Sequence, residues 1–156
     1  RMLYLAERGS LDACEAMARD AITSGAALQK LAEMVAAQGG DASYLSHPEK
    51  FPRASCQRTV VAPCDGYIAS VDTEQYGVAS LLLGAGRSRK EDAIDLSAGF
   101  YLHAKTGDHV RRGDPMVTLY GEKRELLDAA ERTILSATRF SDDAPTLRPL
   151  IFTVCE

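Results

Sequence analysis

Residues 81–99 are the feature that most constrains the fold of this chain. An apolar run from Leu81 stops at Gly84 and Gly86, a basic cluster follows, and an apolar segment resumes at Ile94. Glycine lets the backbone turn tightly or lie close to other backbone. We therefore expect this stretch to be a structural turn.

Two similar fragments lie on either side of that turn, residues 60–68 and residues 105–117. Each is an extended, β-branched run next to an Asp/Gly turn, which is typical of strands and hairpins. Together they predict one small β-rich unit.

Composition excludes several classes of protein. The chain has 156 residues, of which 46% are hydrophobic and 26% charged, with a net charge of -4. This is typical of a soluble protein with one core, and it lacks the basic excess of a nucleic-acid or anionic-membrane surface. No apolar run approaches the roughly 20 residues of a membrane span, and the first residues do not resemble a signal peptide. The four cysteines are Cys14, Cys56, Cys64 and Cys155. Their spacing matches neither a zinc pattern nor a dense disulfide framework, so we expect reduced thiols in the cytosol.

The first part of the chain is predicted to be helical. Residues 2–6 are apolar and look like the end of a helix, and Ser10 can cap a second helix that stops near Gly25. A third helix is expected from Ala26 to Gln38. Its predicted buried residues are Leu28, Leu31, Ala32 and Val35.

The remaining chain is predicted to be a mostly antiparallel, twisted sheet with two helices. Residues 46–52 carry two prolines and no periodicity, which indicates a linker. Thr73 can cap one helix that runs to Leu83, and Gly84 suits the position beyond its end. The expected strands are 58–62, 67–71, 100–104, 116–120 and a closing strand 150–154, and the second helix is 122–136.

The sequence offers no convincing catalytic group of residues. Glycine-rich backbone beside Arg87, Arg89 and Lys90 could cradle a phosphate, but the expected helix precedes the glycines, whereas the dinucleotide motif has a strand before them and a helix after. His103 and His109 flank an expected hairpin and are predicted to be exposed or structural. The acidic residues near turns are predicted to be turn and cap residues; they are Asp92, Asp95, Asp108 and Asp114.

One alternative is a carrier domain. The Ala62–Gly66 run, followed by Gly107-Asp108, Gly113-Asp114 and Glu122-Lys123, resembles the half-motifs of biotinyl and lipoyl carrier domains. In such domains a lysine at a hairpin tip is modified, and Lys123 falls near that place. Some thirty residues separate the halves here, and Lys123 is expected to open a helix, so plain surface charge is the simpler interpretation.

A longer series of motifs resembles the C-terminal part of pyrimidine-nucleoside and thymidine phosphorylases. The resemblance runs from about Met2 to Val154. The motifs occur in order as Ser24-Gly25-Ala26-Ala27, Ala37-Gln38-Gly39-Gly40-Asp41, Asp65-Gly66-Tyr67, Leu83-Gly84-Ala85-Gly86-Arg87, Ile94-Asp95 and Gly107-Asp108-x-Val110-x-x-Gly113-Asp114.

This resemblance implies part of a cytoplasmic, homodimeric salvage enzyme that uses phosphate to cleave the bond between a pyrimidine and its sugar. It implies no covalent cofactor, and it leaves uridine and thymidine open as substrates. The family's substrate-contacting motifs would lie before residue 1, so the resemblance implies a fragment without catalytic residues of its own. It also implies part of a potassium site, formed by the backbone oxygens of Leu3 and Ala6 and the carboxylate of Glu15.

We therefore predict an α+β protein with three parts. Residues 1–45 would be a helical segment of the large α/β phosphorylase domain, residues 46–52 a linker, and residues 53–156 the C-terminal domain. The competing hypotheses are a carrier domain modified at Lys123 and a non-enzymatic scaffold module.

Overall fold

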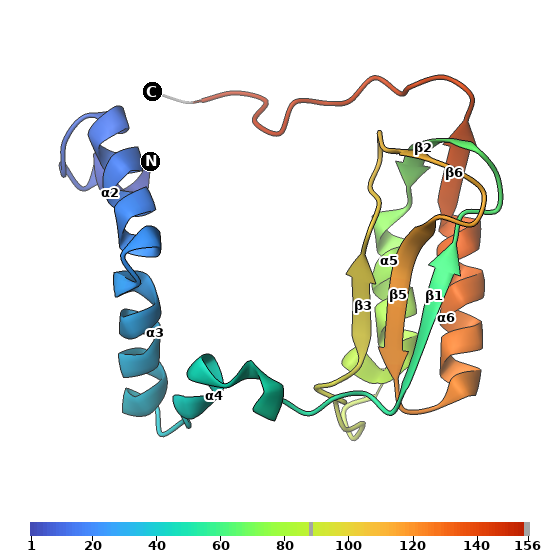
Figure 1. The fold of residues 1–156 in the computed structure, drawn as a ribbon, viewed down its shortest axis with the longest axis horizontal. Coiled ribbons are helices and arrows are strands. Elements are labelled where there is room, and N and C mark those ends of the chain that lie inside the picture. The colour runs from blue at the N-terminus through green and yellow to red at the C-terminus, as the bar shows by residue number, and fades with distance from the viewer. Residues whose placement is uncertain (88, 155–156) are drawn as a thin grey trace. The chain divides into compact units, whose positions relative to one another are not determined.

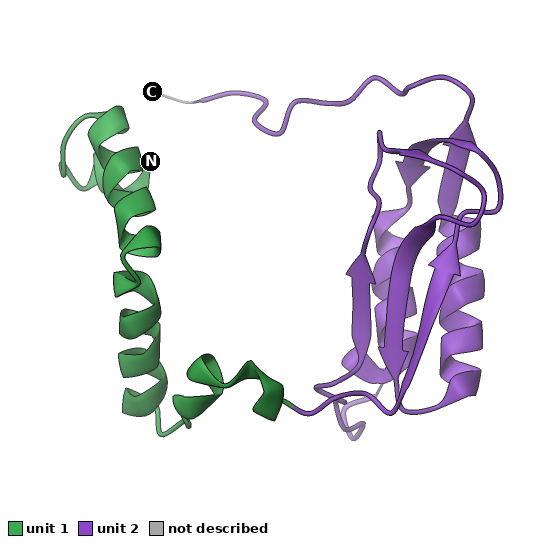
Figure 2. Ribbon diagram, in the orientation of Figure 1, with its two compact units in different colours: residues 1–51 green, residues 52–156 purple. Residues whose placement is uncertain are grey.

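The computed structural model describes residues 1–87 and 89–154. The chain divides into two compact units, Arg1–Phe51 and Pro52–Glu156, which are coloured separately in Figure 2. Ser88, which belongs to the 81–99 stretch, and Cys155, one of the four cysteines, lie outside the described residues.

Unit 1 is helical, as the sequence predicts. Ser10 is the N-cap of α2, because its side-chain oxygen accepts a hydrogen bond from the N–H of Ala13 at 3.3 Å. Gly25 has a left-handed φ of +81° and separates α2 from α3. The elements are α1 (Met2–Leu5), α2 (Leu11–Thr23), α3 (Ala26–Ala37), α4 (Ser43–Ser46) and the 3-10 helix η1 (Pro48–Lys50), which lies where the sequence predicts an aperiodic linker.

Unit 1 has almost no core of its own. Among the described residues of unit 1, Cys14 is the only buried hydrophobic residue. The prediction that Leu28 and Leu31 are buried is wrong for these residues, which are 55% and 39% exposed, and Ala32 and Val35 are only half-buried. Figure 1 shows the reason: α3 continues in line with α2 and does not fold back on it, so the apolar faces of the two helices do not cover each other.

Exchange of backbone amides should report this difference between the units. Amides of Leu11–Gln38 are expected to exchange faster than those of Tyr67–Val71, because the helices lack tertiary contacts that would suppress local opening. Hydrogen–deuterium exchange of the isolated chain measures this directly. Equally strong protection of both regions at low protein concentration would contradict it.

Unit 2 is an α+β domain with two antiparallel three-stranded sheets, in the orders β1-β5-β3 and β4-β2-β6. Figure 1 shows α5 and α6 side by side behind the first sheet. The sequence correctly predicts the fold class and the antiparallel pairing. The elements are β1 (Cys56–Val61), β2 (Gly66–Val71), α5 (Thr73–Ser80), the π-helix η2 (Leu81–Ala85), β3 (Gly99–Leu102), β4 (His109–Val110), β5 (Pro115–Gly121), α6 (Arg124–Ala137) and β6 (Thr138–Ser141).

The core of unit 2 lies between β5 and the two helices. Leu119 of β5 is fully buried, and strand pairing places it opposite Phe100 of β3. Leu127 and Ile134 of α6 are 1% and 0% exposed and belong to the same cluster. Each such side chain contributes roughly 1.5–3 kcal/mol by burial. The predicted inward face of the second helix is therefore confirmed for these residues, whereas Leu126 is only half-buried.

The start of α5 corrects one prediction. Its N-cap is Asp72 and not Thr73, because Asp72 Oδ1 accepts hydrogen bonds from the N–H groups of Glu74 at 3.1 Å and Gln75 at 3.2 Å. Both residue types can cap a helix. Thr73 is instead the first helical residue.

The last strand of the fold also differs from the prediction. Residues 150–154 are irregular and exposed, and the sixth strand is β6, directly after α6. Thr138 follows the helix with φ and ψ of −104° and 126°, so the chain passes from helix to strand without a loop. A strand needs a partner edge. β6 pairs with β2, whereas residues 150–154 pair with no described strand.

Of the two glycines that the sequence assigns to the turn, only Gly84 has a backbone conformation that favours glycine. Gly84 has φ of +103°, whereas Gly86 has extended backbone that other residues adopt. A side chain at Gly86 would meet only the end of the flexible Leu81 side chain. Gly84→Ala is therefore expected to lower the free energy of unfolding by about 1 kcal/mol or more, and Gly86→Ala by less. Chemical denaturation checks this, and the reverse order would contradict the assignment.

Candidate functional site

The start of the glycine turn, Leu83 and Gly84, and residues 93–97 form one wall of a pocket in unit 2. Asp95 donates its backbone N–H to the carbonyl oxygen of Gly84 at 3.0 Å, which closes residues 84–95 into a loop. The pocket, of about 510 Å³, is lined mainly by apolar side chains, together with Asp95, Glu122 and Lys123. Arg87 is exposed and is not among its lining residues. The pocket therefore lacks the paired cations that a phosphate clamp would use.

Asp95 is the most unusual residue of this pocket. Its Oδ1 accepts hydrogen bonds from the Ser97 hydroxyl at 2.7 Å and the Ser97 N–H at 2.8 Å, and these bonds hold the pKa of Asp95 below its usual value. Its Oδ2 is buried and has no hydrogen-bond partner among the described residues. The prediction that Asp95 is a turn residue is correct, because both accepted bonds come from within its own loop.

Lys123 lies at the N-cap of α6, directly after β5. It is exposed and is not at the tip of a hairpin, which is where carrier domains place their modified lysine. Its surroundings favour plain surface charge.

The histidines of unit 2 have structural neighbours. His103 Nε2 lies 2.7 Å from the Thr118 hydroxyl, which in turn lies 3.3 Å from the Thr59 hydroxyl. These contacts join β5 and β1 to the residue that directly follows β3. The ring of His109 stands edge-on to Tyr67, with centroids 4.8 Å apart. Neither histidine bonds to a carboxylate in the part of the chain that the structure describes, so no acid–base pair forms.

The other acidic residues act in turns, as predicted. Asp108 Oδ2 accepts the N–H of Lys105, and Asp114 Oδ2 accepts the N–H of Arg111, both at 2.8 Å. Asp65 Oδ1 accepts the N–H of Arg112 at 2.7 Å and so joins two hairpin loops. These carboxylates are occupied in holding backbone.

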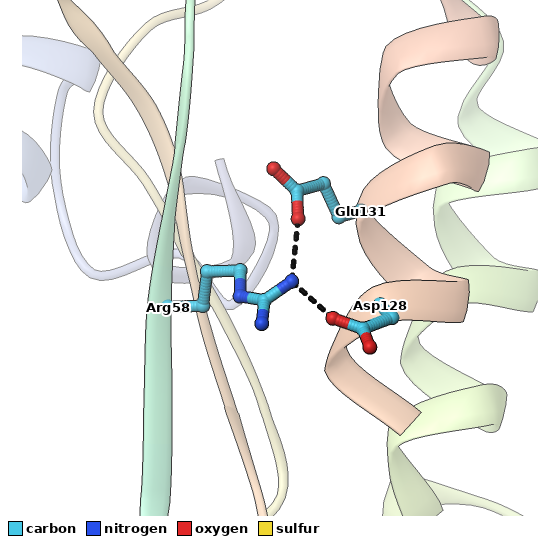
Figure 3. A network of polar contacts seen from close by, with 3 residues as sticks. All are labelled: Arg58, Asp128 and Glu131. Carbon is cyan, nitrogen blue, oxygen red and sulfur yellow. Dashed lines mark hydrogen bonds and ion pairs between the residues drawn. The ribbon is translucent and has the colours of Figure 1, made fainter. Parts of the chain in front are cut away.

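An ion-pair network between β1 and α6 was not predicted from the sequence (Figure 3). Arg58 Nη1 donates to Glu131 Oε2 at 2.8 Å and to the carboxylate of Asp128. The bonds to Glu131 and then Asp128 raise the pKa of Arg58. All three side chains are partly exposed, so solvent weakens the pairs and their main role is orientation of β1 against α6. The spacing of Asp128 and Glu131 on one helix face is the signal that could have indicated a basic partner.

The predicted cation ligands lie in unit 1. Leu3 and Glu15 line the same pocket, whereas Ala6 is not among its lining residues. The Leu3 carbonyl oxygen accepts the N–H of Arg8 at 3.1 Å, and the Glu15 carboxylate pairs with Arg19 at 3.0 Å. A carbonyl oxygen and a carboxylate each keep capacity for a hard cation. The site stays a prediction.

The described residues contain no group of three or more His, Cys, Asp or Glu side chains that could hold a metal ion. None of their helices is long and apolar enough to cross a membrane.

Comparison with known proteins identifies the family. Residues 67–141 match the family described as pyrimidine nucleoside phosphorylase C-terminal domain. Pyrimidine-nucleoside phosphorylase of Staphylococcus epidermidis is 42% identical over 98% of this chain, which corresponds to 36% of that protein. The protein of the same name from Geobacillus stearothermophilus is 40% identical over 94% of this chain, which corresponds to 34% of that protein. The protein of the same name from Staphylococcus aureus is 37% identical over 88% of this chain, which corresponds to 32% of that protein.

The chain thus spans about a third of the length of these curated relatives. Their similarity extends well beyond the domain match and includes both structural units. The chain thus contains a pyrimidine nucleoside phosphorylase C-terminal domain at residues 67–141, and nearly its whole length is similar to proteins named pyrimidine-nucleoside phosphorylase.

Proposed function

We propose that these residues are the C-terminal part of a pyrimidine-nucleoside phosphorylase. In the proposed reaction a phosphate oxygen bonds to the anomeric carbon of the sugar while the bond from that carbon to the pyrimidine nitrogen breaks. The products are a pentose 1-phosphate and a pyrimidine, whose nitrogen takes up a proton. The observation that carries this proposal is the 42% identity to the S. epidermidis phosphorylase over nearly the whole chain.

We propose a structural role for this region within that enzyme. Residues 1–45 would complete the large α/β domain, and residues 53–156 would be the domain that braces it, joined by residues 46–52. Two features support this: unit 1 exposes apolar helix faces that require a partner, and unit 2 has a complete core. By resemblance, the whole protein would be a cytoplasmic homodimer with phosphate as co-substrate and a potassium ion near Leu3, Ala6 and Glu15.

The chain alone is proposed to be inactive. Its pocket residues offer no phosphate clamp and no acid–base pair in the described chain. The test is an assay of phosphate-dependent release of uracil or thymine. It compares the isolated chain with a chimera in which this chain replaces the matching 36% of the S. epidermidis protein.

The carrier alternative predicts a modified Lys123, and we expect none. Lys123 lies at a helix start and is exposed, which is the ordinary setting of a surface lysine. Intact mass spectrometry of protein expressed with an active biotin or lipoyl ligase should give the unmodified mass. A biotinyl or lipoyl increment that Lys123→Arg removes would restore the carrier hypothesis.

A further inference from the structure

The C-terminal segment, residues 142–154, ends in Leu150–Val154, which have the composition of a strand but no partner among the described strands. Leu150, Ile151 and Phe152 are 96%, 69% and 74% exposed. The backbone groups of residues 150–154 make no hydrogen bond to any described residue. β-branched and aromatic residues favour a paired, at least half-buried strand. This segment is thus an exposed apolar strand sequence that lacks a sheet.

The segment is part of what the chain shares with its relatives. The domain match ends at residue 141, directly before it. The similarity to the S. epidermidis protein covers 98% of the chain, so only a few residues at the ends can lie outside. Most of residues 142–154 therefore have a counterpart in a protein about three times as long.

One side chain of the segment lies against unit 2. The Leu147 side chain is so close to Gly107 that a Cβ on that glycine would be 2.9 Å from Leu147 Cδ2. β3 ends at Leu102, shortly before Gly107, and pairs with a described strand on one edge only. The segment does not pair with its other edge.

Side-chain alternation explains why the β3 edge is an unsuitable partner. In a strand, Leu150, Phe152 and Val154 would point to one face and Ile151 and Thr153 to the other, so both faces would carry large apolar side chains. Strands with two apolar faces belong in sheets that are covered on both sides. The sheet that contains β3 has helices on one side only, and Tyr101 on its other face is 63% exposed.

We propose that Leu150–Val154 is an added edge strand for a covered sheet in the upstream part of the same polypeptide, the two thirds that the relatives have and these residues do not. This inference rests on the proposed function. The last strand of unit 2 ends at Ser141, and residues 142–149 can span up to about 27 Å when extended, which is enough to cross from unit 2 to a neighbouring domain. This span requires the Leu147 side chain, which is 60% exposed, to leave Gly107. Unit 2 is then attached to the upstream part at both ends, by residues 46–52 and by this strand, which limits how far it can swing.

Hydrogen exchange tests the proposal on the isolated chain and on the chimera described above. Amides of residues 151–154 should exchange at least about 100-fold more slowly in the chimera, because pairing would protect them. Free exchange in both proteins would overturn the proposal. Protection in the isolated chain would also overturn it. Protection that is independent of protein concentration would indicate pairing within the chain, and protection that rises with concentration would indicate pairing with a second copy.

A second measurement remains decisive if the chimera does not fold. The isolated chain is mixed with the separately produced upstream part of the S. epidermidis protein, and the dissociation constant is measured. Removal of residues 149–156, or Phe152→Asp, should weaken binding at least tenfold, whereas the control Thr146→Asp in the spacer should not. Equal binding by all variants, or no binding by the parent chain, would overturn the proposal.

The same samples separate this proposal from the proposed function. If the chimera releases pyrimidine but the amides of its C-terminal segment exchange freely, the result would contradict the added-strand proposal and leave the proposed function intact. A chimera with a protected segment and no activity would support the strand and count against the phosphorylase assignment.

Discussion

Gly66→Ala is expected to lower the free energy of unfolding of unit 2 by at least about 2 kcal/mol. Gly66 begins β2, the central strand of its sheet, with φ of +139°, a conformation that L-residues with a side chain rarely adopt. A Cβ at this position would lie 2.7 Å from the carbonyl oxygen of Ser141 in β6. That oxygen belongs to backbone, so relief of the clash requires β2 and β6 to separate.

Gly77→Ala is the matched control. Gly77 lies in α5, and a Cβ there would meet no atom within 4 Å. Because alanine favours a helix more than glycine does, this change should raise the free energy of unfolding by about 0.5–1 kcal/mol. Urea denaturation monitored on unit 2 measures both variants. A loss below about 0.5 kcal/mol for Gly66→Ala would contradict the described register of β2 and β6.

The parts of the fold that the sequence predicts well have local causes. Ser10 caps α2 through its own side chain, and Asp108 and Asp114 close turns through the N–H three residues earlier. The inward residues of α6 follow from helical periodicity alone. Each of these signals is complete within a few residues.

The predictions that failed depend on distant partners. Leu28 and Leu31 have the periodicity of a buried face, but the described chain supplies nothing to cover them. Residues 150–154 have the composition of a strand without an edge to join, whereas β6 pairs with β2 although its sequence, Thr-Arg-Phe-Ser, has only moderate strand character. Burial and strand pairing are properties of the assembly, so a local pattern indicates only the capacity for them.

The local hydrogen-bonding roles of single residues near the candidate site were predictable from the sequence. The sequence indicates turn aspartates and structural histidines, and the contacts of Asp95, Asp108 and His103 agree. The bridge from Arg58 to α6 was not predictable, because it joins two elements whose approach depends on the whole fold. The burial of Asp95 Oδ2 was not predictable for the same reason.

Phosphorolysis should be absent from the isolated chain and present in the chimera with the S. epidermidis upstream part. Catalysis of this reaction requires a phosphate clamp, groups that stabilise charge on the departing pyrimidine, and exclusion of water. The described residues provide none of these as a convergent set: Arg87 is exposed, and both histidines of unit 2 contact neutral neighbours. Enzymes typically accelerate reactions by at least about 10⁶-fold, so loss of the clamp removes essentially all detectable turnover.

Two controls make this comparison specific. Omission of phosphate should abolish base release by the chimera, which excludes hydrolysis by a contaminant. Arg87→Ala should leave the chimera active, because Arg87 lies outside the pocket and has no proposed role in catalysis.

The most direct measurement is the initial rate of uracil release from uridine and of thymine release from thymidine, with and without phosphate, for the isolated chain and the chimera at equal concentration. Our account predicts a rate indistinguishable from the no-enzyme control for the isolated chain, and phosphate-dependent release from at least one nucleoside for the chimera. Phosphate-dependent turnover by the isolated chain that Arg87→Ala abolishes, or a folded chimera without activity, would contradict it.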